Sequence, residues 1–216
     1  MKPDFKKNLF DKRLSYEKFE LDFSKVSKNP FDIFAKWYAD AEALLADYEE
    51  ANAVALSTSD QNGNVSSRMV LMKFFSEKGF VFFTNYLSKK GENLSENPHC
   101  SMLFFWPVLQ RQIRIEGIVE KVEETFSDQY FNQRPLESRI SAVVSHQSQE
   151  IEDKLALESK LKSFPDKNNI KRPEYWGGYL IKPHLFEFWQ GRPGRFHDRL
   201  EYYLDNNVWK NRILAP

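Results

Sequence analysis

The chain has 216 residues, of which 41% are hydrophobic and 15% aromatic, including 19 Phe. This length and composition favour one large domain, or at most two small ones, and exclude a disordered chain. Lys and Arg number 31 and Asp and Glu also number 31, so no overall basic field favours nucleic acid or an anionic membrane.

The first part of the chain is a polar segment followed by one clear helix. Residues 1–28 are charged and lack a strong period, so we expect a mobile N-terminal arm or one that docks on the rest. Asn29 and Pro30 are typical of an N-cap and a first helical position, and apolar residues then recur every three to four positions as far as Tyr48. We expect residues 29–216 to form a single domain that begins with this helix.

Strands are expected to dominate the next segment. Alternating patterns bounded by turn residues predict five strands, over residues 53–59, 65–75, 80–85, 100–106 and 112–122. Ser88 is predicted to cap a short helix that ends before Pro98.

The period becomes helical between residues 123 and 163. We expect breaks at Arg134-Pro135 and in the polar loop 146–149, and a polar linker over 163–173. Strands return over residues 176–181, 185–190, 196–204 and 208–214. The pattern predicts a mainly β chain with flanking helices, in which closely spaced antiparallel strands close into a barrel. The motifs of dinucleotide-binding and P-loop folds are absent from the sequence.

Metal binding and membrane insertion are not expected. One Cys and four dispersed His cannot supply a cysteine-rich zinc site. The polar N-terminus leads into no apolar segment, and no stretch approaches the ~18 apolar residues of a membrane helix. We therefore expect a cytoplasmic protein without a metal ion.

Two clusters of cations lie near predicted strand ends. Arg68 and Lys73 bracket four apolar residues on a strand, and on a regular strand they would point to opposite faces. They either contact two anions or are solvated on an edge strand. Ser88, Lys89 and Lys90 begin a helix, where Lys is unfavourable because the dipole already makes that end positive. A bound phosphate would explain this placement, and a solvated pair of Lys is the alternative.

A third cluster consists of Tyr130, Arg134 and Ser138, spaced by four. On a helix they would share one face, although Pro135 must start a new segment or kink the old one. A phenol, a guanidinium and a hydroxyl together suit a phosphate monoester, but this spacing also arises by chance.

A fourth cluster follows Trp189. Arg195, His197 and Arg199 alternate, so on the predicted strand they would face one way. Two Arg beside a His and a Trp are hard to bury without an anion, and they indicate a site for a planar anionic ligand. A purely structural His is the alternative.

In this order and spacing the clusters resemble the pyridoxine/pyridoxamine 5'-phosphate oxidase family, from about residue 29 to the last residue. The motifs that carry the resemblance are Arg68 to Lys73, Phe83-Thr84-Asn85, Ser88-Lys89-Lys90, Arg111-Gln112, Gln133-Arg134-Pro135 through Ser138, Ser145-His146-Gln147-Ser148, Tyr175-Trp176-Gly177-Gly178, Glu187 to Gly191, Arg195 to Arg199 and Arg212 to Pro216. The resemblance implies a split antiparallel β-barrel of the FMN-binding type. It also implies a homodimer with FMN in clefts between the two subunits.

The resemblance further implies roles for individual residues. Those expected to hold the FMN phosphate and ribityl chain are Arg68, Lys89, Lys90, Gln147 and Ser148. Those expected to contact the rest of the flavin are Met69, Val70, Leu71, Met72, Lys73, Phe83, Thr84, Gln112, Trp189 and Arg199. Those expected to hold the substrate phosphate are Lys73, Tyr130, Arg134 and Ser138. Arg195 and His197 are expected to be catalytic, against the pyridine ring, and Arg13 and Tyr16 of the arm to cover the substrate.

The family's activity is oxidation of pyridoxine 5'-phosphate or pyridoxamine 5'-phosphate to pyridoxal 5'-phosphate. A hydride passes from C4' of the substrate to N5 of the flavin, and O2 is reduced to H2O2. The chain departs from the family pattern at Lys89, where Arg is usual, and at Phe83, where Tyr is usual. The alternatives are a flavin reductase-like split barrel and a small β-barrel that binds nucleic acid through its aromatics and local cations.

Overall fold

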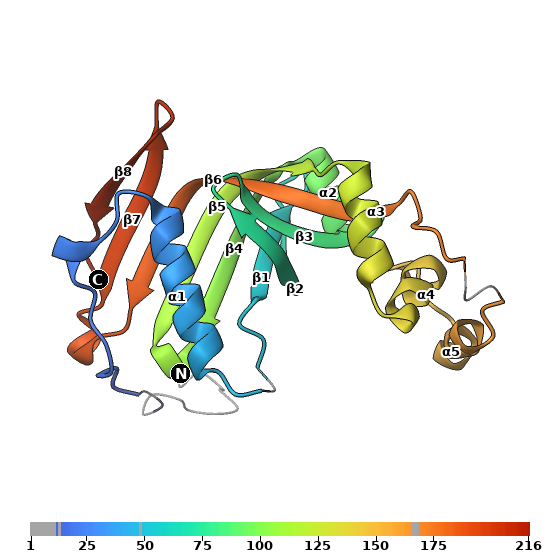
Figure 1. Ribbon diagram of the computed structural model, residues 1–216, viewed down its shortest axis with the longest axis horizontal. Coiled ribbons are helices and arrows are strands. Elements are labelled where there is room, and N and C mark those ends of the chain that lie inside the picture. The colour runs from blue at the N-terminus through green and yellow to red at the C-terminus, as the bar shows by residue number, and fades with distance from the viewer. Residues whose placement is uncertain (1–11, 13, 48, 166–168) are drawn as a thin grey trace, which may run out of the picture.

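The computed structural model describes residues 12, 14–47, 49–165 and 169–216 (Figure 1). Its described part contains one antiparallel sheet with the strand order β3-β2-β1-β4-β5-β6-β7-β8. The strands are β1 (Ala53–Ser59), β2 (Val65–Ser76), β3 (Gly79–Asn85), β4 (His99–Trp106), β5 (Arg111–Lys121), β6 (Trp176–Gln190), β7 (Asp198–Asp205) and β8 (Val208–Ile213). The predicted predominance of β structure is confirmed.

Strand β6 closes the barrel. Its first half pairs with β3, with Phe80 opposite Ile181, and its second half pairs with β7, with Phe188 opposite Leu200. The six strands from β3 to β6 therefore form a closed ring, and β7 and β8 extend from it as a separate wing. This confirms the barrel that the strand pattern predicted and the split form, with flanking helices, that the resemblance implied.

The prediction of two strands at 176–181 and 185–190 was wrong, because β6 is continuous. Pro183 lacks an N–H, which normally interrupts a central strand. Here it lies opposite Gly117, next to a register shift between Glu116 and Gly117 of β5. Because the pairing is already irregular at this bulge, the N–H that Pro183 lacks is not needed there, and the strand continues through the proline.

Five α-helices flank the barrel in the described residues: α1 (Pro30–Leu44), α2 (Lys89–Glu96), α3 (Glu124–Gln133), α4 (Leu136–Val144) and α5 (Lys154–Lys162). Asn29 caps α1, since its side chain accepts a hydrogen bond from the Phe31 N–H. Helix α1 ends at Leu44, earlier than the apolar pattern predicted, and Tyr48 lies outside the described residues. None of the helices that the structure describes has the length and apolar character needed to cross a membrane.

Aromatic side chains join α1 to the sheet. The Phe34 ring is fully buried, and its centroid lies 4.8 Å from that of Phe80 and 5.4 Å from that of Phe104. Further along the same face of α1, Trp37 contacts Phe188 edge to face at 5.4 Å. A second, smaller core of Phe131, Ile140, Ile170 and Trp176 joins α3 and α4 to the start of β6.

The part of the N-terminal arm that the structure describes lies against the turn before β5, the end of β6 and the start of β7. The Lys18 N–H donates to Gln110 Oε1 at 3.2 Å, and the Leu21 N–H donates to Asp198 Oδ2 at 3.0 Å. Tyr16 contacts Trp189 edge to face, with ring centroids 5.8 Å apart. These contacts favour the docked form of the arm, while Arg13, the other predicted substrate cover, lies outside the described residues.

Ile115→Val tests the packing of the barrel core. Ile115 is fully buried on β5, so loss of one methylene is expected to lower the free energy of unfolding by about 1 kcal/mol. The same substitution at Ile151, which is 49% exposed, is expected to cost less than about 0.5 kcal/mol. Urea denaturation of both variants measures the difference, and equal losses would contradict the placement of Ile115 in a tightly packed core.

Candidate active site

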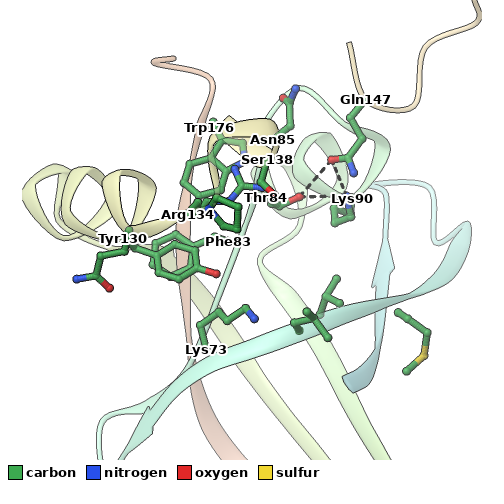
Figure 2. A pocket seen from close by; sticks show the side chains of 15 residues that line it. Lys73, Phe83, Thr84, Asn85, Lys90, Tyr130, Arg134, Ser138, Gln147 and Trp176 are labelled. Atoms are coloured by element: carbon green, nitrogen blue, oxygen red, sulfur yellow. Dashed lines mark hydrogen bonds between the residues drawn. The ribbon is translucent and has the colours of Figure 1, made fainter. Parts of the chain in front are cut away.

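A cavity of about 540 Å³ lies between β2, β3, α2 and the junction of α3 with α4 (Figure 2). Its walls bring together residues from three of the four predicted clusters. The lining residues are Met69, Val70, Leu71, Lys73, Phe83, Thr84, Asn85, Lys90, Tyr130, Gln133, Arg134, Pro135, Ser138, Gln147 and Trp176. Figure 2 shows Lys90, Thr84 and Gln147 on one side, Tyr130 and Phe83 on the other, and Lys73 reaching towards the space from β2.

Lys90 is a buried cation held by neutral groups. Its side chain is only 7% exposed, and Nζ donates to Thr84 Oγ1, Ser88 Oγ and Gln147 Oε1, each at 3.1 Å. Burial, with a smaller contribution from the positive charge of Arg68, lowers the pKa of Lys90 to about 8. A buried ammonium group without a carboxylate partner is costly, and a bound anion would remove that cost.

Arg68 does not line the cavity, but its charge acts on Lys90, and its guanidinium is also bound by neutral oxygens. Its Nη1 donates to the Leu56 carbonyl at 3.1 Å and to Thr58 Oγ1 at 2.8 Å, and Nη2 donates to Ser66 Oγ. Burial lowers the pKa of the Arg68 guanidinium. Among the described residues, neither Arg68 nor Lys90 forms an ion pair with a carboxylate.

The N-terminus of α2 adds to this positive end of the cavity. Ser88 is the N-cap residue, but its hydroxyl donates to the Asn85 carbonyl at 2.6 Å and does not cap a helix N–H. The first-turn N–H groups therefore keep their hydrogen-bonding capacity, and the helix dipole favours negative charge there. Lys90 and the nearby Arg68, two cations without acidic partners beside this terminus, make this end of the cavity suited to an anion such as a phosphate.

The third cluster forms a second cationic group in the same cavity. Tyr130 lies on α3, Arg134 is the C-cap residue of that helix, and Ser138 lies on α4. The predicted break at Arg134-Pro135 turns the chain so that all three side chains line the cavity. Arg134 has a buried Nη1 atom without a hydrogen-bond partner, and burial lowers the pKa of its guanidinium.

Lys73 faces this second group from strand β2. The register of β2 with β3 shifts between Met72 and Phe74, so Lys73 lies at an irregularity. The sequence predicted that Arg68 and Lys73 point to opposite faces only if the strand between them is regular, and this strand is not regular. Lys73 lines the cavity, whereas Met72 is 3% exposed and belongs to the barrel core.

The remaining predicted flavin contacts form a row across another part of the sheet. Trp189 of β6 is paired with Gln112 of β5 on one side and with Arg199 of β7 on the other. Paired residues of antiparallel strands face the same way, so these three side chains share one face. Glu187, which is 4% exposed, accepts from Arg199 Nε and from Arg114 Nη2, both at 2.7 Å.

His197 lies beside this row. Its ring centroid is 4.5 Å from that of Trp189, and its Nδ1 accepts a hydrogen bond from the Arg192 N–H at 3.1 Å. Burial, followed by the charge of Arg195, lowers the pKa of His197. Because Nδ1 accepts this hydrogen bond, the neutral form of the ring carries its proton on Nε2. A second cavity of about 510 Å³ is lined by Leu14, Ser15, Tyr16, Arg192, Gly194, Arg195 and His197.

The predicted strand over 196–204 was wrong at its start, because β7 begins at Asp198. Arg195 ends a short 3-10 turn, Pro193–Arg195, and has a left-handed backbone with φ of 65°. Arg195 and His197 therefore do not alternate with Arg199 on a strand. A turn brings Arg195 and His197 to the cavity next to Tyr16, while Arg199 stays in the sheet.

The two cavities do not merge within one chain. Figure 1 shows α3 and α4 at the opposite end of the molecule from β7, β8 and the C-terminus. Lys89 and Ser148 lie at neither cavity, since they line a third one with Asp60 and Glu92. The predicted site residues are thus grouped in three places on the protomer.

Several residues that support the predicted contacts carried no assigned role in the sequence. Thr58 accepts from Arg68, Glu187 holds Arg199, and Trp176 lies against Arg134. Trp176 belongs to a motif on which the resemblance rests, but the position of that motif in the sequence does not show that Trp176 contacts Arg134. These partners are distant in sequence, so only the folded chain shows them.

Two family models match this chain, one in its first part and one in its last. A family model described as pyridoxamine 5'-phosphate oxidase matches residues 41–165. A model described as the C-terminal dimerisation region of pyridoxine 5'-phosphate oxidase matches residues 176–216.

Relatives named pyridoxine/pyridoxamine 5'-phosphate oxidase align over nearly the whole chain. The one from Bordetella pertussis is 49% identical, over 95% of this chain and 98% of the relative. The one from Nostoc punctiforme is 48% identical, over 97% of this chain and 99% of the relative. The chloroplastic enzyme of Arabidopsis thaliana is also 48% identical over 94% of this chain, which spans only 40% of that longer protein.

Among solved structures, PhzG from Burkholderia lata, in complex with tetrahydrophenazine-1-carboxylic acid, has a TM-score of 0.85 and 31% identity. The alignment covers 94% of this chain and all of PhzG. A pyridoxamine 5'-phosphate oxidase-related, FMN-binding protein from Nostoc punctiforme has a TM-score of 0.70 at 16% identity, over 88% of this chain and all of that one, and supports the fold alone. The matched regions and these identities together show that the chain belongs to the pyridoxine/pyridoxamine 5'-phosphate oxidase family of oxidoreductases.

Proposed function

We propose that the chain is an FMN-dependent oxidase that converts pyridoxine 5'-phosphate or pyridoxamine 5'-phosphate to pyridoxal 5'-phosphate. The observation that carries this proposal is a cavity lined by Lys73, Lys90 and Arg134, with the charge of Arg68 close to Lys90. None of these four cations forms an ion pair with a carboxylate among the described residues. Arg68 and Lys90 suit the phosphate of FMN, and Lys73 and Arg134 suit the phosphate of a substrate. The two ligands would then lie side by side in the space between them.

The proposal needs a second copy of the chain. Gln112, Trp189 and Arg199 would contact the flavin, and Arg195 and His197 the substrate ring, but in one protomer these residues lie away from the 540 Å³ cavity. We propose that a homodimer places the Trp189 face of one protomer against that cavity of the other. The match of residues 176–216 to a dimerisation region supports this arrangement.

The chain's own residues would bind and orient the substrate. Lys73 and Arg134 would fix its phosphate, with Tyr130 and Ser138 adding hydrogen bonds, and such positioning lowers the entropic part of the barrier. The Nε2–H of His197 would donate to the ring substituents, and Arg195 would stabilise negative charge that develops there. The redox chemistry would be that of bound FMN, namely hydride acceptance from C4' and reoxidation by O2 to give H2O2. With pyridoxamine 5'-phosphate the oxidised product is an imine, which water would hydrolyse to the aldehyde with release of ammonia.

The weaker assignments stay predictions. Lys89 and Ser148 would have to reach the FMN phosphate from the neighbouring third cavity, and Tyr16 would cover the substrate through its contact with His197. Membership of an oxidoreductase family argues against the nucleic-acid-binding barrel. The cytoplasmic location also stays a prediction.

A visible spectrum tests the proposed function. The purified protein is expected to show bound oxidised flavin, to bleach on anaerobic addition of pyridoxamine 5'-phosphate, and to regain its colour in air. Bleaching by NADH but not by either B6 phosphate would instead support a flavin reductase-like enzyme. Bleaching only by a reduced phenazine precursor would support the chemistry of a PhzG-type relative, and a colourless protein that cannot take up FMN would contradict the proposal.

A further inference from the structure

Arg134 is held in place without an acidic partner. Its Nη1 atom is buried and has no hydrogen-bond acceptor, and no carboxylate lies within ion-pair distance among the described residues. Arginine has five N–H donors and usually satisfies several of them when buried. Another contact must therefore keep this guanidinium at the cavity wall.

Trp176 provides that contact. The guanidinium carbon of Arg134 lies over the indole ring, 4.6 Å from its centroid, and both side chains line the cavity (Figure 2). A guanidinium attracted to an aromatic face keeps the N–H donors at its edge available to an anion. The unpartnered Nη1 atom agrees with this arrangement.

The Trp176 ring is itself fixed from several sides. It is 6% exposed, stacks on Phe83 with ring centroids 5.6 Å apart, and meets Phe131 edge to face at 5.2 Å. Its carbonyl accepts from Arg172 Nη1 at 2.7 Å, and Arg172 Nε is paired with Asp128 of α3 at 2.6 Å. The start of β6 is thereby connected to α3, the helix whose C-cap residue is Arg134.

Arg111 shows what a structural arginine looks like in the same chain. Its guanidinium carbon also lies over an indole ring, that of Trp37, at 4.5 Å. However, its Nη1 is paired with Asp40 at 2.6 Å and its Nε donates to Gln190 Oε1 at 2.9 Å. Arg134 lies over an indole ring as Arg111 does, but it has no counterpart of the Asp40 and Gln190 acceptors. Its N–H donors therefore stay available to a ligand.

We propose that Trp176 is a positioning residue that holds the Arg134 guanidinium ready for the phosphate group of the substrate. The inference rests on the proposed function. It means that Trp176, which does not itself contact the phosphate, contributes to the preference for phosphorylated over unphosphorylated substrates by positioning Arg134.

Replacing Trp176 tests the proposal through substrate discrimination. Trp176→Leu is expected to raise KM for pyridoxine 5'-phosphate by roughly 5- to 30-fold, the range of a lost cation–π contact. KM for unphosphorylated pyridoxine and the FMN content are expected to stay within about twofold. Trp176→Phe, which keeps an aromatic face and secures the test if the Leu variant folds poorly, is expected to recover part of the loss. Isothermal titration of the FMN-loaded protein with pyridoxal 5'-phosphate gives the same comparison without turnover.

A double-mutant cycle separates positioning from general damage. In an Arg134→Met background, Trp176→Leu is expected to cause no further change in KM for the phosphorylated substrate. Ile170→Val, a control in the same small core that makes no ring contact with Trp176, is expected to leave the ratio of the two KM values unchanged. Additive effects of Trp176 and Arg134, or equal losses for both substrates, would overturn the inference. A wild-type protein that does not distinguish phosphorylated from unphosphorylated substrate would instead overturn the proposed function.

Discussion

Lys90→Met is expected to weaken FMN binding by about 30-fold or more without lowering the stability of the apoprotein. Affinity falls because the ammonium group lies in the first turn of α2, where its charge adds to that of the helix dipole. Stability is preserved because the charge is a cost at neutral pH: burial and the nearby Arg68 lower the pKa of Lys90 to about 8. Methionine fills similar space without that cost.

The same pKa gives the effect a pH dependence. Between about pH 8 and the ordinary lysine pKa of 10.5, Lys90 loses its proton in the folded apoprotein but keeps it in the unfolded chain. This group therefore makes the apoprotein more stable as the pH rises through that window. FMN binding weakens over the same window, because the phosphate ester, with a second pKa of about 6, is already a dianion and the cation that faces it is lost. Lys90→Met is expected to abolish both trends.

Fluorescence titration of apoprotein with FMN between pH 7 and 10, together with thermal melts, measures these effects. Lys36→Met, on the exposed face of α1, is the control and is expected to change neither quantity. Lys89→Met is expected to cost much less affinity than Lys90→Met, since Lys89 is exposed and lines another cavity with Asp60. Equal losses of FMN affinity for the two lysines would contradict the distinct role of Lys90, and a destabilised Lys90→Met apoprotein would show that Lys90 is a structural group.

Local patterns predicted most of the fold, and long-range pairing accounts for what they missed. Alternation on β5 and the cap at Asn29 report on neighbours within a few residues, so β5 and the start of α1 were predicted at nearly their observed bounds. Pro183 also follows a local rule, but the bulge that accommodates it lies on β5, far away in sequence. The closure of β6 on β3 has no local signal at all.

The candidate site divides in the same way. The break at Arg134-Pro135 and the helix start at Ser88 are local, and both lie where the sequence predicted. The dependence of Arg134 on Trp176, however, arises from the packing of α3 against β6. Physical reasoning on single segments could identify the cations, but it could not say which of them lack acidic partners.

Arg134→Met is expected to raise KM for pyridoxine 5'-phosphate by about 100-fold while leaving FMN content unchanged. The loss is large because Arg134 offers unpaired donors at a buried position, so no internal partner compensates when the phosphate contact is removed. Arg134→Lys retains the charge but not the planar fork or its place over the indole ring, so it is expected to recover only part of the affinity.

Arg139→Met is the matched control for this prediction. Arg139 lies on α4 and also has a buried atom, Nε, without a hydrogen-bond partner, but it lines a separate cavity with Asp128 and Lys171. Steady-state kinetics with phosphorylated and unphosphorylated pyridoxine are expected to show no change in their KM ratio for this variant. If Arg139→Met raised KM for the phosphate ester as much as Arg134→Met, the effect would come from the overall charge of the α3–α4 region, and a direct contact between Arg134 and the substrate phosphate would be ruled out.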